Sequence, residues 1–217
     1  MFALGICGSP REGNTEIILK SALDDLNQFD VESDLILLRK MNINYCDSCY
    51  QCQRKQHGHQ CVKKDDVSQI VHPKMLEADV IIFGSPSYYG SVSAQMKTLM
   101  DRCFPFLNMY SPGPLRGKYA INVVCYGRSG GIHVAQTTLD HWCMCMGMHV
   151  FDNLSFKVLN KSDAKDNYSI SVKLRLTSIG LLETMDATPK DKAYKTAFPR
   201  IIANEDALLD PWKASLK

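Results

Sequence analysis

Short apolar segments alternate with amphipathic helical segments along most of this chain, and this alternation restricts the possible folds more than any other feature. We expect strands at residues 2–7, 33–38, 79–84, 119–125 and 149–158. We expect helices at residues 15–28, 67–77, 93–103, 132–146 and 165–184. Strands that alternate with helices predict a parallel sheet covered by helices on both faces. The sequence therefore predicts an α/β fold with a doubly wound five-stranded parallel sheet.

The last helical segment and the irregular regions need separate interpretation. Residues 165–184 also alternate like a strand, but their length favours a helix. Residues 44–64 form a cysteine-rich loop after the second strand. We assign residues 1–186 to a single domain that includes this loop, and residues 187–217 to a C-terminal extension that packs on the domain or on a partner subunit.

Length, charge and cysteine content exclude several classes of protein. A chain of 217 residues suffices for one α/β domain with a sizeable core. A net charge of +2 does not indicate the basic surface that proteins use to bind nucleic acid. No apolar run approaches the roughly 20 residues that cross a membrane, and residues 1–6 lack the basic region of a signal peptide. Nine cysteines without a secretion signal indicate a reducing compartment, so we expect a cytoplasmic protein.

Four of these cysteines lie close together in the loop after the second strand. Cys46, Cys49, Cys52 and Cys61 have the spacing C-x2-C-x2-C-x8-C, which is typical of iron–sulfur ligands. Because the loop follows the second strand, we expect it to begin at the carboxyl edge of the sheet. The prediction is a redox-active cluster held by four thiolates.

Two other interpretations of the cysteine run remain open at this point. A structural zinc ion could take three of the thiols together with the fourth, or with His57 or His59. Alternatively, the thiols bind no metal and form adventitious disulfides after purification in air. Zinc would fix the loop but would transfer no electrons.

The loop after the first strand is suited to binding a phosphate group. Backbone N–H groups and a helix N-terminus attract an anion, and hydroxyl, amide and guanidinium side chains can add further donors. Asn14 stands where a nucleotide-triphosphate loop carries lysine, which argues against ATP or GTP hydrolysis. The alternative is a helix capped by Asn14 or Thr15 with no ligand. The candidate phosphate-binding residues are Ser9, Arg11, Gly13, Asn14 and Thr15.

Two further loops can complete a site for a planar ring. In a doubly wound sheet of order 2-1-3-4-5, the loops after the first and third strands meet at the topological switch point. Tyrosine rings can cover a heterocycle, and glycines let the backbone approach it. Three such loops at one edge predict a site for flavin mononucleotide. The candidate ring-binding residues are Pro86, Ser87, Tyr88, Tyr89 and Gly90 after the third strand, and Tyr126, Gly127, Gly130 and Gly131 after the fourth.

The remaining cysteines and one charged pair have ordinary structural interpretations. We expect the cysteines outside the loop to act as small buried hydrophobic residues. Asp101 and Arg102 are predicted to form a local ion pair near a helix end. The cysteines concerned are Cys7, Cys103, Cys125, Cys143 and Cys145.

Two motifs connect the chain to a known family. G-S-P-R-x-G-N-T after the first strand and S-P-x-Y-Y-G-S-V-S-A-Q-M-K-x-x-x-D-R after the third resemble the NADPH-dependent FMN reductase group of flavodoxin-like proteins. The cysteine run resembles the iron–sulfur flavoprotein branch of that group, although its x8 gap is longer than usual and carries His57 and His59. The resemblance covers about residues 2–158.

This resemblance implies a flavodoxin-like fold, bound FMN, and a [4Fe–4S] cluster on the four loop cysteines. It further implies a homodimer or homotetramer with ferredoxin as the one-electron donor. We therefore expect electron transfer from such a donor to a small-molecule two-electron acceptor, with no catalytic side chain. The first alternative is an NAD(P)H-dependent FMN, quinone or azo reductase with a structural cysteine loop. The second is a flavin-binding sensor or docking module without turnover.

Overall fold

A computed structural model describes residues 1–54, 60–107, 113–127 and 131–185. Five parallel strands form one sheet with the order β2-β1-β3-β4-β5. This order and the α/β class confirm the predicted doubly wound sheet. The strands are β1 (Phe2–Cys7), β2 (Glu32–Leu37), β3 (Val80–Pro86), β4 (Tyr119–Tyr126) and β5 (His149–Lys157).

The predicted helices are present, with small changes at their ends. The predicted helix at 67–77 begins with a π-helical turn, Val67–Val71, and α2 follows directly and covers only the second half. The ambiguous segment is helical from Tyr168, after Asn167, whose side chain accepts a hydrogen bond from the Ile170 N–H. The helices are α1 (Asn14–Asn27), α2 (His72–Glu77), α3 (Ala94–Arg102), α4 (Ile132–Cys145) and α5 (Tyr168–Thr184).

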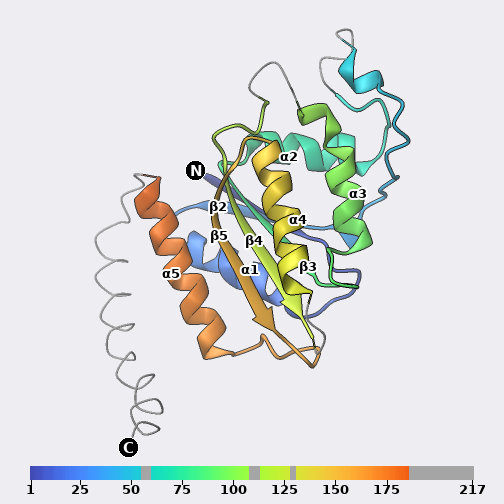
Figure 1. Cartoon of the computed structure of the whole chain (residues 1–217). Helices are drawn as coiled ribbons and strands as arrows, with labels where there is room; N and C mark the ends of the chain where they lie inside the picture. Colours follow the sequence, from blue (N-terminus) through green and yellow to red (C-terminus); the bar gives the residue numbers. More distant parts are fainter. Residues whose placement is uncertain (55–59, 108–112, 128–130, 186–217) are drawn as a thin grey trace, which may run out of the picture.

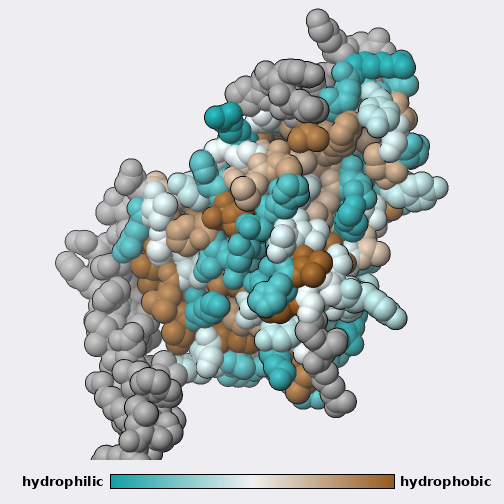
Figure 2. All heavy atoms as spheres, in the orientation of Figure 1, coloured by the Kyte–Doolittle hydropathy of each residue, from teal (hydrophilic) through white to brown (hydrophobic). Residues whose placement is uncertain are grey.

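The helices form two layers, one on each face of the sheet (Figure 1). Alternate strand residues face opposite layers: Leu4 and Ile6 pack toward α2, α3 and α4, whereas Ala3 and Cys7 pack toward α1 and α5. The chain therefore buries two apolar clusters, and the carboxyl ends of all strands meet at one edge. Figure 2 shows apolar surface over α5, where Tyr168 and Leu176 are exposed.

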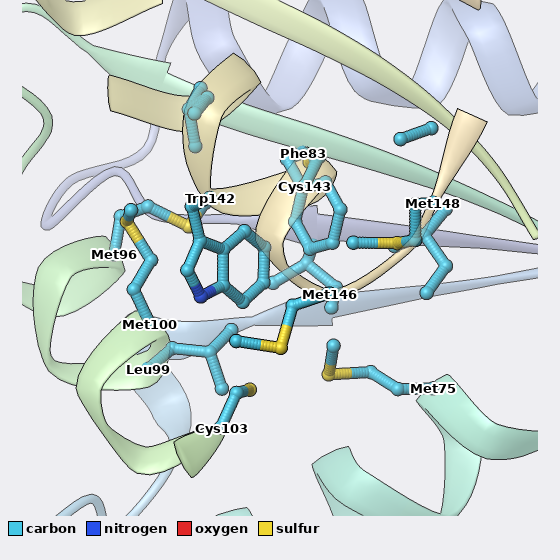
Figure 3. Packing of buried hydrophobic residues seen from close by; sticks show 14 of the residues in the cluster. Met75, Phe83, Met96, Leu99, Met100, Cys103, Trp142, Cys143, Met146 and Met148 are labelled. Carbon is cyan, nitrogen blue, oxygen red and sulfur yellow. The ribbon is translucent and has the colours of Figure 1, made fainter. Parts of the chain in front are cut away.

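Sulfur-containing side chains fill much of the core between the sheet, α3 and α4 (Figure 3). The Trp142 ring meets the edge of Phe83 with its centroid 5.0 Å away. Flexible thioethers adapt to irregular space, so they can fit around these two rings. The sulfur-containing residues of this cluster are Met75, Met96, Met100, Met146, Met148, Cys103 and Cys143.

One part of the prediction lies outside the described residues, and the membrane prediction is tested only within them. Residues 187–217, the predicted extension, lie outside the described residues, so their packing stays a prediction. Within the described ranges, every helix is too short or too polar to cross a bilayer.

The buried His72 makes stability depend on pH. His72 is 5% exposed, and its ring stacks on Phe106 at 4.5 Å. Burial, reinforced by the positive charge of Arg102, lowers its pKa to about 4. Since protonation then favours the unfolded chain, the stabilisation is complete above pH 6.5 and declines as the pH falls toward 4.

We predict that wild-type protein loses about 3 kcal/mol more than His72→Gln between pH 7 and pH 4. Denaturant unfolding at each pH measures this difference. His133→Gln, at an exposed position of α4, should keep the wild-type dependence. Parallel pH profiles for wild type and His72→Gln would contradict the prediction.

Candidate functional site

The loop between β1 and α1 is shaped by its own polar side chains. The buried Ser9 hydroxyl donates to the Arg11 carbonyl oxygen at 2.6 Å and accepts from the Arg11 N–H at 3.4 Å. Gly13 is the N-cap of α1 and has no side chain to accept from the first-turn N–H groups. The exposed Arg11 belongs to the same loop. Backbone donors at this N-terminus are therefore the groups best suited to an anion.

Asn14 and Thr15 have different surroundings from those the sequence suggested. Neither caps the helix, because Gly13 occupies the N-cap position, so the predicted capping by Asn14 or Thr15 is wrong, and phosphate binding by this loop stays a prediction. The Asn14 amide donates to Asn160 O at 2.6 Å and accepts from Ala164 N–H at 2.8 Å. Thr15 is buried against the sheet beside Gly84. Both side chains brace the loop.

The segment after β5 covers one side of this loop, which the sequence did not predict. A Cβ on Gly13 would lie 3.3 Å from the Lys161 carbonyl oxygen, so only glycine allows this approach without adjustment. Asp163 accepts from the N–H groups of Leu159 and Asn160 at 2.7 and 2.8 Å, which holds the segment in a tight turn. Asn160 and Asp163 are residue types that favour turns, so they were the sequence signal that could have indicated this turn.

The loop after β3 contains a strained, fully exposed aromatic residue. Tyr88 and Ser91 exchange two backbone hydrogen bonds, of 2.9 and 3.0 Å, around a two-residue turn. The central residues Tyr89 and Gly90 both have positive φ, 51° and 75°. This is the pattern of a type I′ turn, which favours asparagine over tyrosine at its first central position. Such strain on an exposed ring is characteristic of a functional site.

The loops after β3 and β4 are in contact. The Ser87 N–H donates to Cys125 O at 2.7 Å. A Cβ on Gly131 would lie 2.4 Å from the Gly90 Cα, so any side chain there would push the loops apart. Pro86, Tyr126 and Gly127 are half-buried around this contact, and Gly130 lies outside the described residues. The three candidate flavin loops thus meet at one edge of the sheet.

All four loop cysteines line a single cavity of about 410 Å³. Tyr50 and Phe104, whose rings meet edge to face at 5.7 Å, also line it. The cavity lies at the C-terminal end of α3, whereas the flavin loops meet its N-terminal end (Figure 1). The nine residues of α3 span about 13 Å. The cysteine loop starts at the carboxyl edge as predicted, but its thiols lie far from it.

The four thiols share one cavity but are not gathered around a single point. Burial raises the pKa of Cys52, and the neighbouring thiols of Cys61, Cys49 and Cys46 raise it further. Among the described residues, no three Cys, His, Asp or Glu side chains lie close enough together to hold one metal ion. His57 and His59 lie outside the described residues. The donor set is therefore four soft sulfurs around a shared space.

A buried arginine holds the cysteine loop against α3. Arg102 forms a bidentate ion pair with Asp65, with N–O distances of 2.5 and 2.9 Å, and both side chains are 1% exposed. Arg102 also donates to Asn44 O at 2.6 Å and to Cys61 Sγ at 3.3 Å. Burial would raise the pKa of Asp65, but hydrogen bonds from Arg102 and the Asn44 N–H lower it well below its ordinary value.

The predicted Asp101–Arg102 pair is therefore wrong. Asp101 pairs instead with Lys97, one helical turn earlier. Adjacent residues on a helix point in different directions, so Asp101 faces solvent while Arg102 faces the loop. The partner of Arg102 is 37 residues away in the sequence.

The other cysteines are buried, with one exception. Burial raises the pKa of the thiols of Cys7 and Cys125 to about 11 and 12, which makes them unreactive. Cys103 and Cys143 are also buried, as predicted. Cys145 is exposed at the end of α4, with its sulfur 3.5 Å from His141 Nε2, so its assignment to the core was wrong.

Comparison with known proteins gives a consistent result. The NADPH-dependent FMN reductase family matches residues 1–162. An iron–sulfur flavoprotein of Methanosarcina thermophila is 31% identical over 170 residues, which cover 77% of this chain and 86% of that protein. One from Methanocaldococcus jannaschii is 36% identical over 140 residues, covering 64% and 69%. A second from that organism is 46% identical over 106 residues, about half of either chain (48% and 53%).

Solved structures resemble the fold at lower sequence identity. A NAD(P)H:quinone oxidoreductase from Methanothermobacter marburgensis has a TM-score of 0.60 at 16% identity, covering 83% of this chain and 94% of that one. An archaeal flavodoxin has a TM-score of 0.54 at 18% identity, covering 86% and 99%. The fold is thus flavodoxin-like.

We predict that Tyr89→Asn stabilises the protein by about 0.5 to 1 kcal/mol, because asparagine adopts positive φ at lower cost. Tyr88→Asn, at the preceding exposed position, should bring no such gain. Denaturant unfolding of the flavin-free proteins compares them. Equal stability of Tyr89→Asn and wild type would show that the turn is not strained.

Proposed function

This chain belongs to the NADPH-dependent FMN reductase family and is a flavin-dependent oxidoreductase, and we propose that it is an FMN- and [4Fe–4S]-containing iron–sulfur flavoprotein. Its reaction is electron transfer between a one-electron donor and a small-molecule two-electron acceptor. The observation that carries this proposal is the single cavity lined by Cys46, Cys49, Cys52 and Cys61, in a chain whose three candidate flavin loops meet at one edge of the sheet.

The proposed flavin site uses backbone donors for the phosphate and aromatic loops for the ring. The first-turn N–H groups of α1 and the Arg11 guanidinium would bind the phosphate. Ser9, Asn14 and Thr15 would keep the loop in shape through the contacts described above. Tyr88 and Tyr89 would cover the ring, and the contact between Gly90 and Gly131 would set the width of the crevice.

The donor set of the cavity fits an iron–sulfur cluster. Thiolates are the ligands that such clusters use, and four of them line the same cavity. Thiols spread along the wall of one cavity suit a group with several metal atoms better than one zinc ion, which needs four donors about 2.3 Å from a single point. Zinc bound with His57 or His59 remains the competing assignment.

The bound groups supply the redox chemistry, since a flavin exchanges two electrons and a cluster one. The residues of this chain bind, orient and shield them. We propose ferredoxin as the donor, a homodimer or homotetramer as the assembly, and the cytoplasm as the location. Support for the donor comes from the resemblance of the cysteine run to the iron–sulfur flavoprotein branch.

A second candidate function is an NAD(P)H-dependent FMN, quinone or azo reductase with a structural cysteine loop. The position of the thiols at the opposite end of α3 from the flavin loops favours it, because the flavin could then work without the thiols. Bleaching of bound flavin by NADPH that is equally fast in wild type and Cys49→Ser would support this reductase.

The cluster assignment is tested by purification without oxygen, followed by iron, sulfide and flavin analysis. We predict iron and sulfide in equal amounts in the wild type and their loss in Cys49→Ser, because one of four thiolate ligands is gone. Cys145→Ser, an exposed cysteine outside the cavity, should retain both. Stoichiometric zinc without sulfide would overturn the assignment.

The flavin site is tested at the contact between the two loops. We predict that Gly131→Ala weakens FMN binding at least tenfold, about 1.4 kcal/mol, because its Cβ would clash with Gly90. Gly117→Ala is the matched control: Gly117 also has positive φ, 81°, but nothing lies within 4 Å of its added Cβ.

Gly117→Ala should lose about 1 kcal/mol of stability from backbone strain, and Gly131→Ala should lose more because of its added clash with Gly90, whereas only Gly131→Ala should change the Kd for FMN. Fluorescence titration of the flavin-free proteins gives the Kd. Equal affinity in the two variants would remove this loop contact from the flavin site.

A further inference from the structure

The guanidinium of Arg102 is the one cation among the described residues with a hydrogen bond to a loop cysteine, at 3.3 Å from Cys61 Sγ. We propose that Arg102 is a positioning residue that raises the reduction potential of the group held by the four cysteines. Its N–H would donate to the sulfur of Cys61 while that sulfur is a ligand. This inference rests on the proposed function, because it needs a redox group in the cavity.

The position of Arg102 is fixed by several independent contacts. One amino group contacts Asp65 and Asn44 O, and the other contacts Asp65 and Cys61. Asp65 is itself held by the N–H groups of Asn44 and Ser68, at 3.0 and 3.4 Å. A guanidinium with these partners cannot turn away from the sulfur without breaking the ion pair.

These contacts also connect the two ends of the cysteine loop. Asn44 precedes Cys46 by two residues, and Asp65 follows Cys61 by four. Arg102 binds both, so it clamps the loop onto the end of α3 and forms part of the cavity wall. This clamping is a structural role, and the proposal adds an electrostatic one.

The electrostatic role follows from the charge at the sulfur. When one electron enters the group from an external donor, the negative charge on its thiolate ligands increases. An N–H donor and a nearby positive charge stabilise this more negative state and raise the potential. Asp65 offsets part of the charge of Arg102, so the directed N–H to sulfur contact supplies the effect on Cys61.

Lys63 offers a comparison within the same cavity. It is also a cation on the wall, but its ammonium pairs with Asp47 at 2.9 Å and is partly exposed. Solvent screens such a charge, so its influence on the cavity should be small. Substituting each cation in turn separates a hydrogen bond to sulfur from a positive charge nearby.

The experiment is an anaerobic redox titration of the whole, cofactor-loaded protein, followed by EPR and visible absorption. Arg102→Lys keeps the positive charge but loses the planar guanidinium, whose N–H donors have a fixed geometry. Arg102→Gln combined with Asp65→Asn avoids leaving a buried carboxylate unpaired, which alone would threaten folding. Lys63→Met is the control, and iron and sulfide content is measured for every protein.

We expect both Arg102 variants to retain iron and sulfide and to be at least tenfold harder to reduce at the cluster, a shift of 59 mV to more negative potential. The flavin potential in the same titration should not change, and Lys63→Met should match the wild type. A merely structural role would leave the cluster potential unaltered.

Two results would overturn the inference while leaving the proposed function intact. One is an unchanged potential in cluster-loaded Arg102 variants. The other is loss of iron from both variants while Lys63→Met keeps it, since Arg102 would then act only as a clamp. Absence of iron and sulfide from the wild type would instead refute the proposed function, and the inference with it.

Discussion

Buried polar contacts hold α3 at both ends, and the positions of both candidate sites depend on them. At its start, the Ser93 hydroxyl donates to Gly8 O at 2.5 Å and accepts from the Met96 N–H at 3.2 Å. At its end, Arg102 forms the ion pair with Asp65. A helix is stiff over this length, so α3 fixes the distance between the phosphate loop and the thiols. Removing either contact would leave a buried polar group unpaired, which is costly.

Most of the fold could be predicted because it follows from local periodicity. The apolar runs gave the strands, and the motif after β1 gave the start of α1 to within one residue. Even the ambiguous segment at 165–184 was assigned correctly as a helix, which the structure places at Tyr168–Thr184, because the segment is too long for a typical strand. The glycine motifs also indicated which loops meet, since parallel strands bring their carboxyl ends to one edge.

Contacts between distant residues could not be predicted in this way. Arg102 was paired with its neighbour Asp101, although burial selects a partner on another segment. Asn14 was assigned to a ligand, and its amide contacts residues 146 and 150 positions away. The four cysteines do line one cavity, but their spacing gave no indication of where the irregular loop would place it. Spacing constrains which residues meet, and the packing of the loop decides where.

The sulfur-rich core has a consequence for the handling of this protein in air. Met100 and Met146 belong both to that core and to the wall of the thiol cavity. Oxidants produced beside the thiols would therefore encounter thioethers before they reach the sheet. Conversion to sulfoxide makes such side chains polar, and polar groups between α3 and α4 would loosen their packing against Trp142. Damage at the cavity would thus spread inward as a loss of structural integrity.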